Sequence, residues 1–254
     1  MSFNIVHLNP NITNDKLTLI LYVHLHLGDL INSASLIREY AKTYKVTFTT
    51  LPENLDTAKV LFSDVDDISF LLTDKLFRDN RKQYTHLNRN YNYTIMTGNH
   101  VPGFDNANIP LSYYTQLGYD TSIMKTNFVR KAITNPNFQE LNNIKFIFVS
   151  LRAFDMQDEL NITSTYLILC PNKNYYQPGH QYYELAQKFM NLSFFEYTEI
   201  LENAEELHLI DNALFYHAHY LNLNASKKVC YYRWFDYKFY DNTWDYVYVK
   251  DLTF

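Results

Sequence analysis

Apolar residues along the chain fall into short runs that alternate with amphipathic stretches. The first run, residues 17–23, has the length of a buried strand and is too short to cross a bilayer. A helix is predicted to begin at Leu30, because four apolar residues recur from there at helical spacing. A buried strand, a turn at Gly28 and an amphipathic helix form the opening unit of a wound α/β domain, whose ligands lie at the carboxyl ends of the strands. Asp29 lies at such an end and is the first candidate for chemistry. The recurring apolar residues are Leu30, Ala34, Ile37 and Ala41.

The alternation of strands and helices occurs in two blocks. Residues 131–143 separate the blocks, are polar and contain Pro136, which predicts a domain boundary. We therefore expect an α/β protein of two Rossmann-like domains, 1–130 and 144–254, that face each other across a cleft. Residues 1–16 are predicted to be a polar lead-in. Further strands are predicted at 45–49, 68–72, 93–97, 145–150, 166–170, 206–210, 228–232 and 246–249, and helices at 54–62, 112–117, 181–190, 196–203 and 213–221.

The composition is that of a globular protein with a large core. Of 254 residues, 47% are hydrophobic and 19% are charged, which excludes a disordered chain. The net charge of -5 argues against nucleic-acid binding and against a polybasic membrane anchor. No signal peptide and no membrane span are recognised, and Cys170 and Cys230 are expected to be buried reduced thiols, so a cytoplasmic protein is expected.

Several familiar cofactor and metal motifs are absent. The chain has five glycines, and neither a dinucleotide fingerprint, a P-loop nor a nucleophile elbow can be built from them. His24 and His26 share one face of a strand, but no carboxylate or cysteine follows at a familiar spacing, and a polar pair at a strand end is the preferred interpretation. Asp64 and Asp66 are interpreted as a solvated turn. No metal and no cofactor are expected.

Two stretches resemble the heptosyltransferase-like glycosyltransferases of the GT-B fold. Residues 26–31, followed by 36–38, resemble the strand–turn–helix that opens the N-terminal domain, and residues 201–221 resemble a C-terminal segment of the same group. Residues 112–120 are similar to the end of the first domain in small viral and bacterial relatives. The resemblance implies an inverting, metal-independent transfer of a sugar from a nucleotide-sugar donor, with UDP or GDP as the expected nucleotide, to a hydroxyl of a glycan acceptor.

The resemblance gives Asp29 the role of the base that removes the proton of the attacking hydroxyl, which is chemistry that a carboxylate can perform. The alternative role of Asp29 is an N-cap of the helix that begins at Leu30. The candidate acceptor-binding residues, chosen because they lie near strand ends of the first domain, are His26, Asn32, His100 and Tyr113.

The donor is expected at the strand ends of the second domain. Asp211 is expected to cap a helix whose first amides, at Asn212 and Ala213, bind a phosphate. Arg152, after the strand 145–150, is the cation expected at the diphosphate, with an ordinary surface arginine as its alternative. The remaining candidate donor-binding residues are Asn172, Lys173, Tyr175 and, as a candidate for the ribose, Glu202.

One departure from the related group supports a different function. That group usually carries a histidine five residues after the second turn aspartate, where this chain has Tyr216, with His217 next to it. A catalytically inactive protein of the same fold that binds a glycan or a partner is therefore the first alternative. A methyltransferase that uses S-adenosylmethionine is the second.

Overall fold

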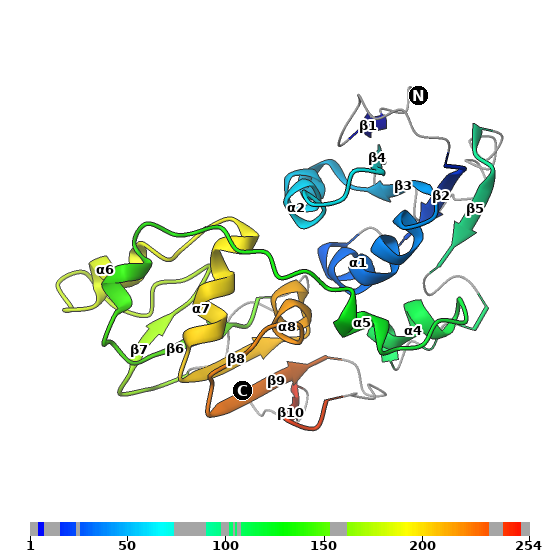
Figure 1. Ribbon diagram of the computed structural model, residues 1–254. Helices are drawn as coiled ribbons and strands as arrows, with labels where there is room; N and C mark the ends of the chain where they lie inside the picture. The colour runs from blue at the N-terminus through cyan, green and yellow to red at the C-terminus, as the bar shows by residue number, and fades with distance from the viewer. Residues whose placement is uncertain are drawn as a thin grey trace. The chain divides into compact units, whose positions relative to one another are not determined.

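The computed structural model divides the chain into two compact units, Met1–Val129 and Arg130–Phe254. Each unit contains one five-stranded sheet, and Figure 1 labels its strands and helices. The residues that the structure describes are 5–7, 16–23, 26–73, 90–97, 102–103, 105, 108–152, 162–233 and 241–249.

The sheet of the first unit has the strand order β1-β4-β3-β2-β5. Four of these strands are parallel, and β1 pairs antiparallel with β4. The prediction of a polar lead-in is therefore wrong at β1, because a strand of three residues is too short to give a periodic signal. β2 is buried on both faces, as parallel strands covered by helices are. The strands are β1 (Ile5–His7), β2 (Thr18–Tyr22), β3 (Lys45–Thr50), β4 (Ile68–Leu72) and β5 (Tyr93–Met96).

Helix α1 (Leu27–Ala41) begins three residues earlier than predicted. His26 is its N-cap residue, and the carboxylate of Asp29 accepts a hydrogen bond from the backbone N–H of His26 at 3.1 Å. This contact stabilises a first turn that includes Gly28, so the expected glycine turn is part of the helix. α1 contacts β3 and two later helices, and its residues from Leu30 to Arg38 are all buried. The other helical segments of this unit are η1 (Pro52–Asn54), α2 (Leu55–Leu61), α4 (Ile109–Thr115) and α5 (Ile123–Thr126).

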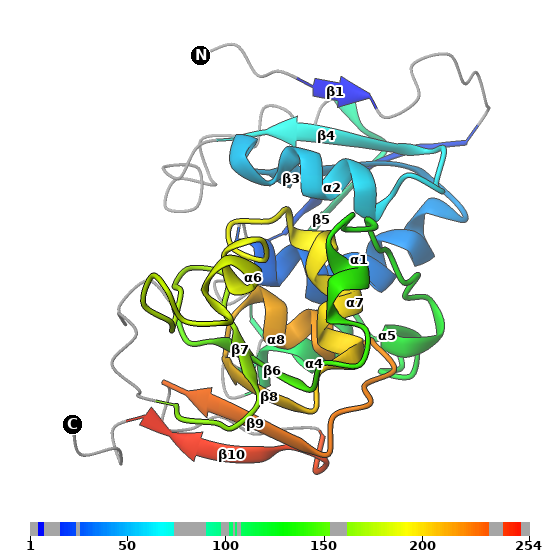
Figure 2. The same cartoon turned by 90° about the vertical axis from the view of Figure 1, so that its left-hand side faces the viewer.

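The sheet of the second unit is parallel throughout, in the order β10-β9-β8-β6-β7. Helices α7 (Tyr197–Asn203) and α8 (Ala213–Ala218) contact each other and lie on the same side of this sheet in both views (Figures 1 and 2). The remaining elements are η4 (Phe138–Leu141), β6 (Phe146–Ser150), β7 (Leu167–Leu169), α6 (Tyr183–Gln187), η5 (Phe194–Glu196), β8 (Glu206–Ile210), β9 (Lys227–Tyr232) and β10 (Asp245–Tyr248).

Residues 131–143, which the sequence predicted to separate two domains, make contacts within the second unit. The backbone N–H of Ile133 donates to the carbonyl of Phe195 at 3.1 Å, and the hydroxyl of Thr198 donates to the carbonyl of Lys131 at 2.8 Å. η4 lies in this stretch, and Glu140 there forms an ion pair with Lys188 at 2.7 Å.

Both sheets have a doubly wound order, which confirms the prediction of an α/β protein with two Rossmann-like units. In the first unit the chain winds from β2 through β3 to β4 and then returns to place β5 on the other side of β2. In the second unit β7 and β8 flank β6 in the same way. Doubly wound sheets bind ligands outside the carboxyl ends of the two strands where the winding reverses. The candidate sites are therefore the ends of β2 and β5 and the ends of β6 and β8. Among the described residues, no helix has the length and apolar character needed to cross a membrane.

Candidate functional site

Asp29 is held by hydrogen bonds from two parts of the first unit. Its Oδ2 accepts the N–H of His26 at 3.1 Å, and its Oδ1 accepts the hydroxyl of Tyr113 at 2.6 Å. Tyr113 comes from α4, which follows β5, whereas Asp29 follows β2, so the pair joins the two strand ends where the winding reverses. The side chain of Asp29 is half-buried, and each of its oxygens acts as an acceptor, as in an ionised carboxylate. Asp29 supports the start of α1 from the third helical position. The N-cap, which was the alternative role considered for Asp29, is His26.

Asn32 lies one helical turn after Asp29, on the same side of α1. It is fully buried, and neither its Oδ1 nor its Nδ2 has a hydrogen-bond partner among the described residues. Its backbone carbonyl accepts the hydroxyl of Tyr114 at 2.7 Å. A buried amide without a partner costs about 1–3 kcal/mol for each unpaired group, and such groups are uncommon in native structures. The first unit thus places a carboxylate and an unpaired amide close together at its switch point.

Two predicted residues of the first unit cannot be placed. His100, an acceptor candidate, and His24, half of the possible metal pair, lie outside the described residues. Within the described part of the chain, no group of three or more histidine, cysteine, aspartate or glutamate residues is arranged to hold a metal ion.

In the second unit, Asn212 connects the ends of β6 and β8. Its Oδ1 accepts the backbone N–H groups of Leu214 and Phe215 at 3.0 and 3.2 Å, so Asn212 caps α8. Its Nδ2 lies 3.3 Å from both the Ser150 hydroxyl and the Arg152 carbonyl. The cap predicted at Asp211 is therefore at Asn212, because an Asn side chain at this position reaches two amides of the first turn.

The cap at Asn212 affects the phosphate site that was predicted at the amino end of α8. Two amides of its first turn are occupied by Asn212, and the N–H of Asn212 itself donates to the carbonyl of Ile210 at 2.6 Å. The Asn212 N–H that was predicted to bind a phosphate therefore has a backbone partner in this structure. The contact through Ala213, which is half-buried at the first helical position, stays a prediction.

Asp211 is buried and paired with Arg233. Arg233 Nε donates to Asp211 Oδ1 at 2.7 Å, and Arg233 Nη2 donates to the Asp211 carbonyl at 3.3 Å. Burial raises the pKa of Asp211 to about 6, although the arginine acts in the opposite direction. The sequence analysis missed Arg233. The signal was its position directly after the predicted strand 228–232, beside the strand that ends at Asp211.

Arg152 is the cation with the most open environment at this edge of the sheet. It is exposed, and its guanidinium has no hydrogen bond or ion pair with any residue that the structure describes. Its backbone is fixed by Asn212 at the end of β6. The sequence left two roles open for Arg152, an ordinary surface arginine and a residue that binds the diphosphate. Its exposure is compatible with both roles.

Three further donor candidates follow β7, the neighbour of β6 on the side away from β8. Asn172 is exposed, and Lys173 places its Nζ 4.8 Å from the centre of the Tyr175 ring. Tyr175 packs on the apolar cluster of the sheet that contains Val149 and Leu151. This side of β6 lies toward the second strand of the unit, which is where a Rossmann fold places the nucleoside.

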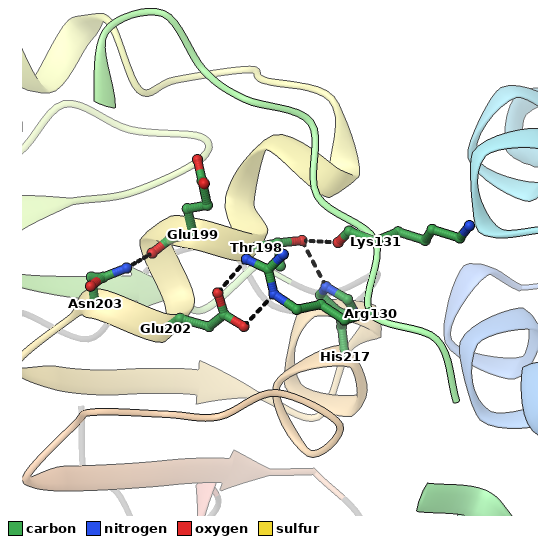
Figure 3. A network of polar contacts seen from close by, with 7 residues as sticks. All are labelled: Arg130, Lys131, Thr198, Glu199, Glu202, Asn203 and His217. Atoms are coloured by element: carbon green, nitrogen blue, oxygen red, sulfur yellow. Dashed lines mark hydrogen bonds and ion pairs between the residues drawn. The ribbon is translucent and has the colours of Figure 1, made fainter. Parts of the chain in front are cut away.

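Glu202 is engaged in an ion pair (Figure 3). Its two oxygens accept Arg130 Nε and Nη2 at 2.7 and 2.6 Å. Arg130 is the first residue of the second unit, so the pair attaches the entering chain to α7. The carboxylate that was expected at a ribose is therefore occupied by a structural arginine.

His217 of α8 is fully buried and lies next to Thr198, which binds the chain at Lys131 (Figure 3). Its Nε2 is 3.0 Å from the hydroxyl of Thr198, which itself donates to the Lys131 carbonyl, so the imidazole donates from Nε2. Burial, with a smaller contribution from Arg130, lowers the pKa of His217 to about 3. The imidazole is therefore neutral near pH 7, and the neighbouring Tyr216 is buried as well.

Comparisons with known proteins give one structural likeness. No protein-family model and no curated protein matches the chain. The crystal structure of the glycosyl transferase family 9 from Veillonella parvula DSM 2008 superposes with a TM-score of 0.49 at 10% sequence identity, over 87% of this chain and 83% of that chain.

Proposed function

We propose that this chain is a glycosyltransferase that moves a sugar from a nucleotide-sugar donor to a hydroxyl of a glycan acceptor, with inversion and without a metal. The observation that carries the proposal is Asp29, a half-buried carboxylate held by Tyr113 and His26 at the switch point of a Rossmann-like unit. The resemblance of residues 26–31, 36–38 and 201–221 to heptosyltransferase-like enzymes supports it, since these stretches are distributed over both units.

On the acceptor side, Asp29 acts as the general base. An inverting transfer requires that the acceptor hydroxyl loses its proton as its oxygen attacks the anomeric carbon. The hydrogen bond from Tyr113 fixes one carboxylate oxygen, and the contact with His26 fixes the other. His26, Asn32 and His100 are proposed to contact the acceptor, and Asn32 has an amide with unused donors and acceptors.

On the donor side, Arg152 stabilises the nucleoside diphosphate that leaves. Negative charge develops on the diphosphate as its bond to the sugar breaks, and a guanidinium binds phosphate oxygens through two parallel hydrogen bonds. Arg152 suits this role because it is exposed and because its backbone is fixed beside the switch point of the second unit. Asn172, Lys173 and Tyr175 are proposed to contact the nucleoside beyond β7.

A binding experiment with a matched control tests the donor site. Thermal unfolding of the wild-type protein with UDP, GDP, ADP and CMP compounds should show a rise in melting temperature for one nucleoside diphosphate, because a ligand of the native state stabilises it. Arg152→Gln should weaken that ligand about tenfold or more, as the loss of a charge-assisted contact does. Lys145→Gln is the control, since it removes one positive charge at the opposite end of β6.

The outcome separates the proposal from its alternatives. A ligand that the two variants bind equally well would remove Arg152 from the site. Binding of a nucleotide sugar without transfer to any acceptor would favour the inactive binding protein. A stabilisation by S-adenosylmethionine, and none by any nucleoside diphosphate, would favour the methyltransferase.

A further inference from the structure

The side chain of Asn212 makes more contacts than a helix cap requires. Its Oδ1 accepts the backbone N–H groups of Leu214 and Phe215, as the oxygen of an N-cap residue does. The amide nitrogen takes no part in the cap. It lies 3.3 Å from the Ser150 hydroxyl and 3.3 Å from the Arg152 carbonyl, both at the end of β6. One short side chain therefore joins the start of α8 to the residue that is proposed to bind the diphosphate.

The neighbours of this amide determine its orientation. Backbone N–H groups can only donate, so the oxygen faces Leu214 and Phe215, and a carbonyl can only accept, so the nitrogen faces Arg152. Serine is a comparably favoured cap, but its side chain is one atom shorter and ends in the hydroxyl that makes the cap. The contact with the Arg152 carbonyl therefore needs the carboxamide, and helix capping alone does not.

Arg152 lies beyond the paired part of β6, so its backbone depends on this contact. The pairing of β6 with β7 ends at Phe148, and its pairing with β8 ends at Ser150, opposite Leu209. Among the residues that the structure describes, Asn212 is the one that hydrogen-bonds to Arg152. Without the amide nitrogen of Asn212, the backbone of Arg152 loses this attachment to the sheet.

We propose that Asn212 is a positioning residue of the donor site, which holds the backbone of Arg152 in place for the diphosphate. This inference rests on the proposed function, because it assigns the support of the arginine that binds the leaving group. A backbone that is already fixed loses less conformational freedom when the ligand binds, so the affinity is higher. Asn212 itself acts without touching the ligand, since its backbone N–H, its Oδ1 and its Nδ2 all have protein partners.

The variant Asn212→Ser separates the two functions of the side chain, because serine keeps a favoured cap and loses both contacts of Nδ2. Titration calorimetry should show that this variant binds the nucleoside diphosphate selected above about threefold to tenfold more weakly, as expected for the loss of one hydrogen bond. Its melting temperature should stay close to that of the wild type. The matched control is Asn203→Ser, which removes an amide that donates to the Glu199 carbonyl at 2.8 Å on α7, and it should leave the affinity unchanged (Figure 3).

A double variant distinguishes positioning from a structural role alone. If Asn212 acts through Arg152, Asn212→Ser should cause no further loss of affinity once Arg152→Gln has removed the guanidinium. An equal loss with and without the guanidinium would show that Asn212 contributes independently of Arg152, and this result overturns the inference. A lower melting temperature of Asn212→Ser with unchanged affinity overturns it as well.

Failure of the proposed function gives a different pattern. If no nucleoside diphosphate binds, or if Arg152→Gln binds it as tightly as the wild type, the proposed donor site is contradicted and the inference falls with it. If Arg152→Gln weakens the ligand and Asn212→Ser does not, the inference alone is overturned and the proposed function stands.

Discussion

Asp29 and Asp211 occupy similar places in two similar sheets but have opposite environments. Each follows a parallel strand at the point where the winding of its unit reverses. Asp29 is half-buried and accepts hydrogen bonds from a tyrosine hydroxyl and a backbone amide. Asp211 is buried under an arginine, and its pKa is raised to about 6. The same residue type near the switch point is thus half-buried between hydrogen-bond donors in one unit, and buried against an arginine in the other.

The difference comes from the residues that surround each strand end. In the first unit, Asp29 lies in the first turn of α1, and Tyr113 approaches from α4. In the second unit, Asn212 takes the capping position, so Asp211 turns toward β9 and Arg233. Asp29 lies three residues after the N-cap residue of α1, whereas Asp211 lies one residue before the N-cap residue of α8, so the two carboxylates have different neighbours.

The largest expected effect is the loss of transfer activity when Asp29 is replaced. Asp29→Asn keeps the shape of the side chain but removes the base, and transfer should fall by about a thousandfold, within the usual range for general base catalysis. Nucleotide affinity should not change, because the proposed donor site lies in the other unit. Transfer assays and calorimetry on the same preparation measure the two quantities. Asp56→Asn, at an exposed position of α2, is the control and should keep full activity.

Retained transfer in Asp29→Asn would contradict the base role and would leave the contact with His26 as the function of this carboxylate. Loss of nucleotide binding together with transfer would show instead that the variant is damaged as a whole. Circular dichroism of the variant distinguishes damage from a specific chemical defect.

The next prediction concerns the pH dependence of stability in the second unit. Asp211 has a pKa above its ordinary value, so it contributes stability at low pH that is lost as the pH rises through about 6. His217 has a pKa lowered to about 3, so its contribution is present above the ordinary value of a histidine and is lost as the pH falls toward 3. Between about pH 4.5 and pH 7 each group changes the free energy of unfolding by about 2 kcal/mol, with opposite sign.

Two variants separate the opposing contributions of Asp211 and His217 to the pH dependence of stability. His217→Gln keeps a donor toward Thr198 and should become less stable, relative to wild type, as the pH rises over this range. Asp211→Asn should show the reverse trend, with stability that increases with pH. Urea unfolding at several pH values gives both slopes. Parallel profiles for the two variants would contradict the assignment of these buried groups.

Much of the fold could be predicted from the sequence. The strands β4 and β8 were predicted at their observed bounds, because each is a short apolar run between polar turns. β1 was missed, since three residues carry no periodicity. The start of α1 was placed too late because Gly28 was interpreted as a turn, whereas the contact between Asp29 and His26 stabilises it inside the helix.

The candidate site was less predictable because contacts between distant residues determine it. Tyr113 was proposed from its position near a strand end, but its bond to Asp29 joins residues 84 positions apart in the chain. Glu202 was proposed for a ribose, and only the fold shows that Arg130 occupies it. Arg233 was overlooked because its pairing with Asp211 depends on the order of the strands, which periodicity does not give.

A smaller loss of transfer activity is expected when the hydrogen bond from Tyr113 to Asp29 is removed. Tyr113→Phe deletes the hydroxyl that donates at 2.6 Å and keeps the buried ring. Hydrogen bonds to charged groups contribute about 1.5–3 kcal/mol, so transfer should fall by about tenfold to a hundredfold. The pH profile of transfer should shift as well, because the hydroxyl favours the ionised carboxylate. Tyr114→Phe removes the neighbouring hydroxyl, which donates to the Asn32 carbonyl, and is the control; an equal loss in both variants would contradict a specific role of Tyr113.

The smallest effect is a change in the free energy of unfolding when Asn32 is replaced. The change should have the opposite sign to that at Asn212 in the second unit. Asn32→Leu replaces two unpaired buried polar groups with an apolar side chain of similar size, and the free energy of unfolding should rise by about 1 kcal/mol. Transfer to the acceptor should fall at the same time, since the amide is proposed to bind an acceptor hydroxyl, while nucleotide affinity stays unchanged. Asn212→Leu is the comparison in the second unit, where the side chain makes four hydrogen bonds, and it should lower stability. If Asn32→Leu lowers stability too, the amide is a structural group with partners that form in solution, and the first unit loses its candidate acceptor contact.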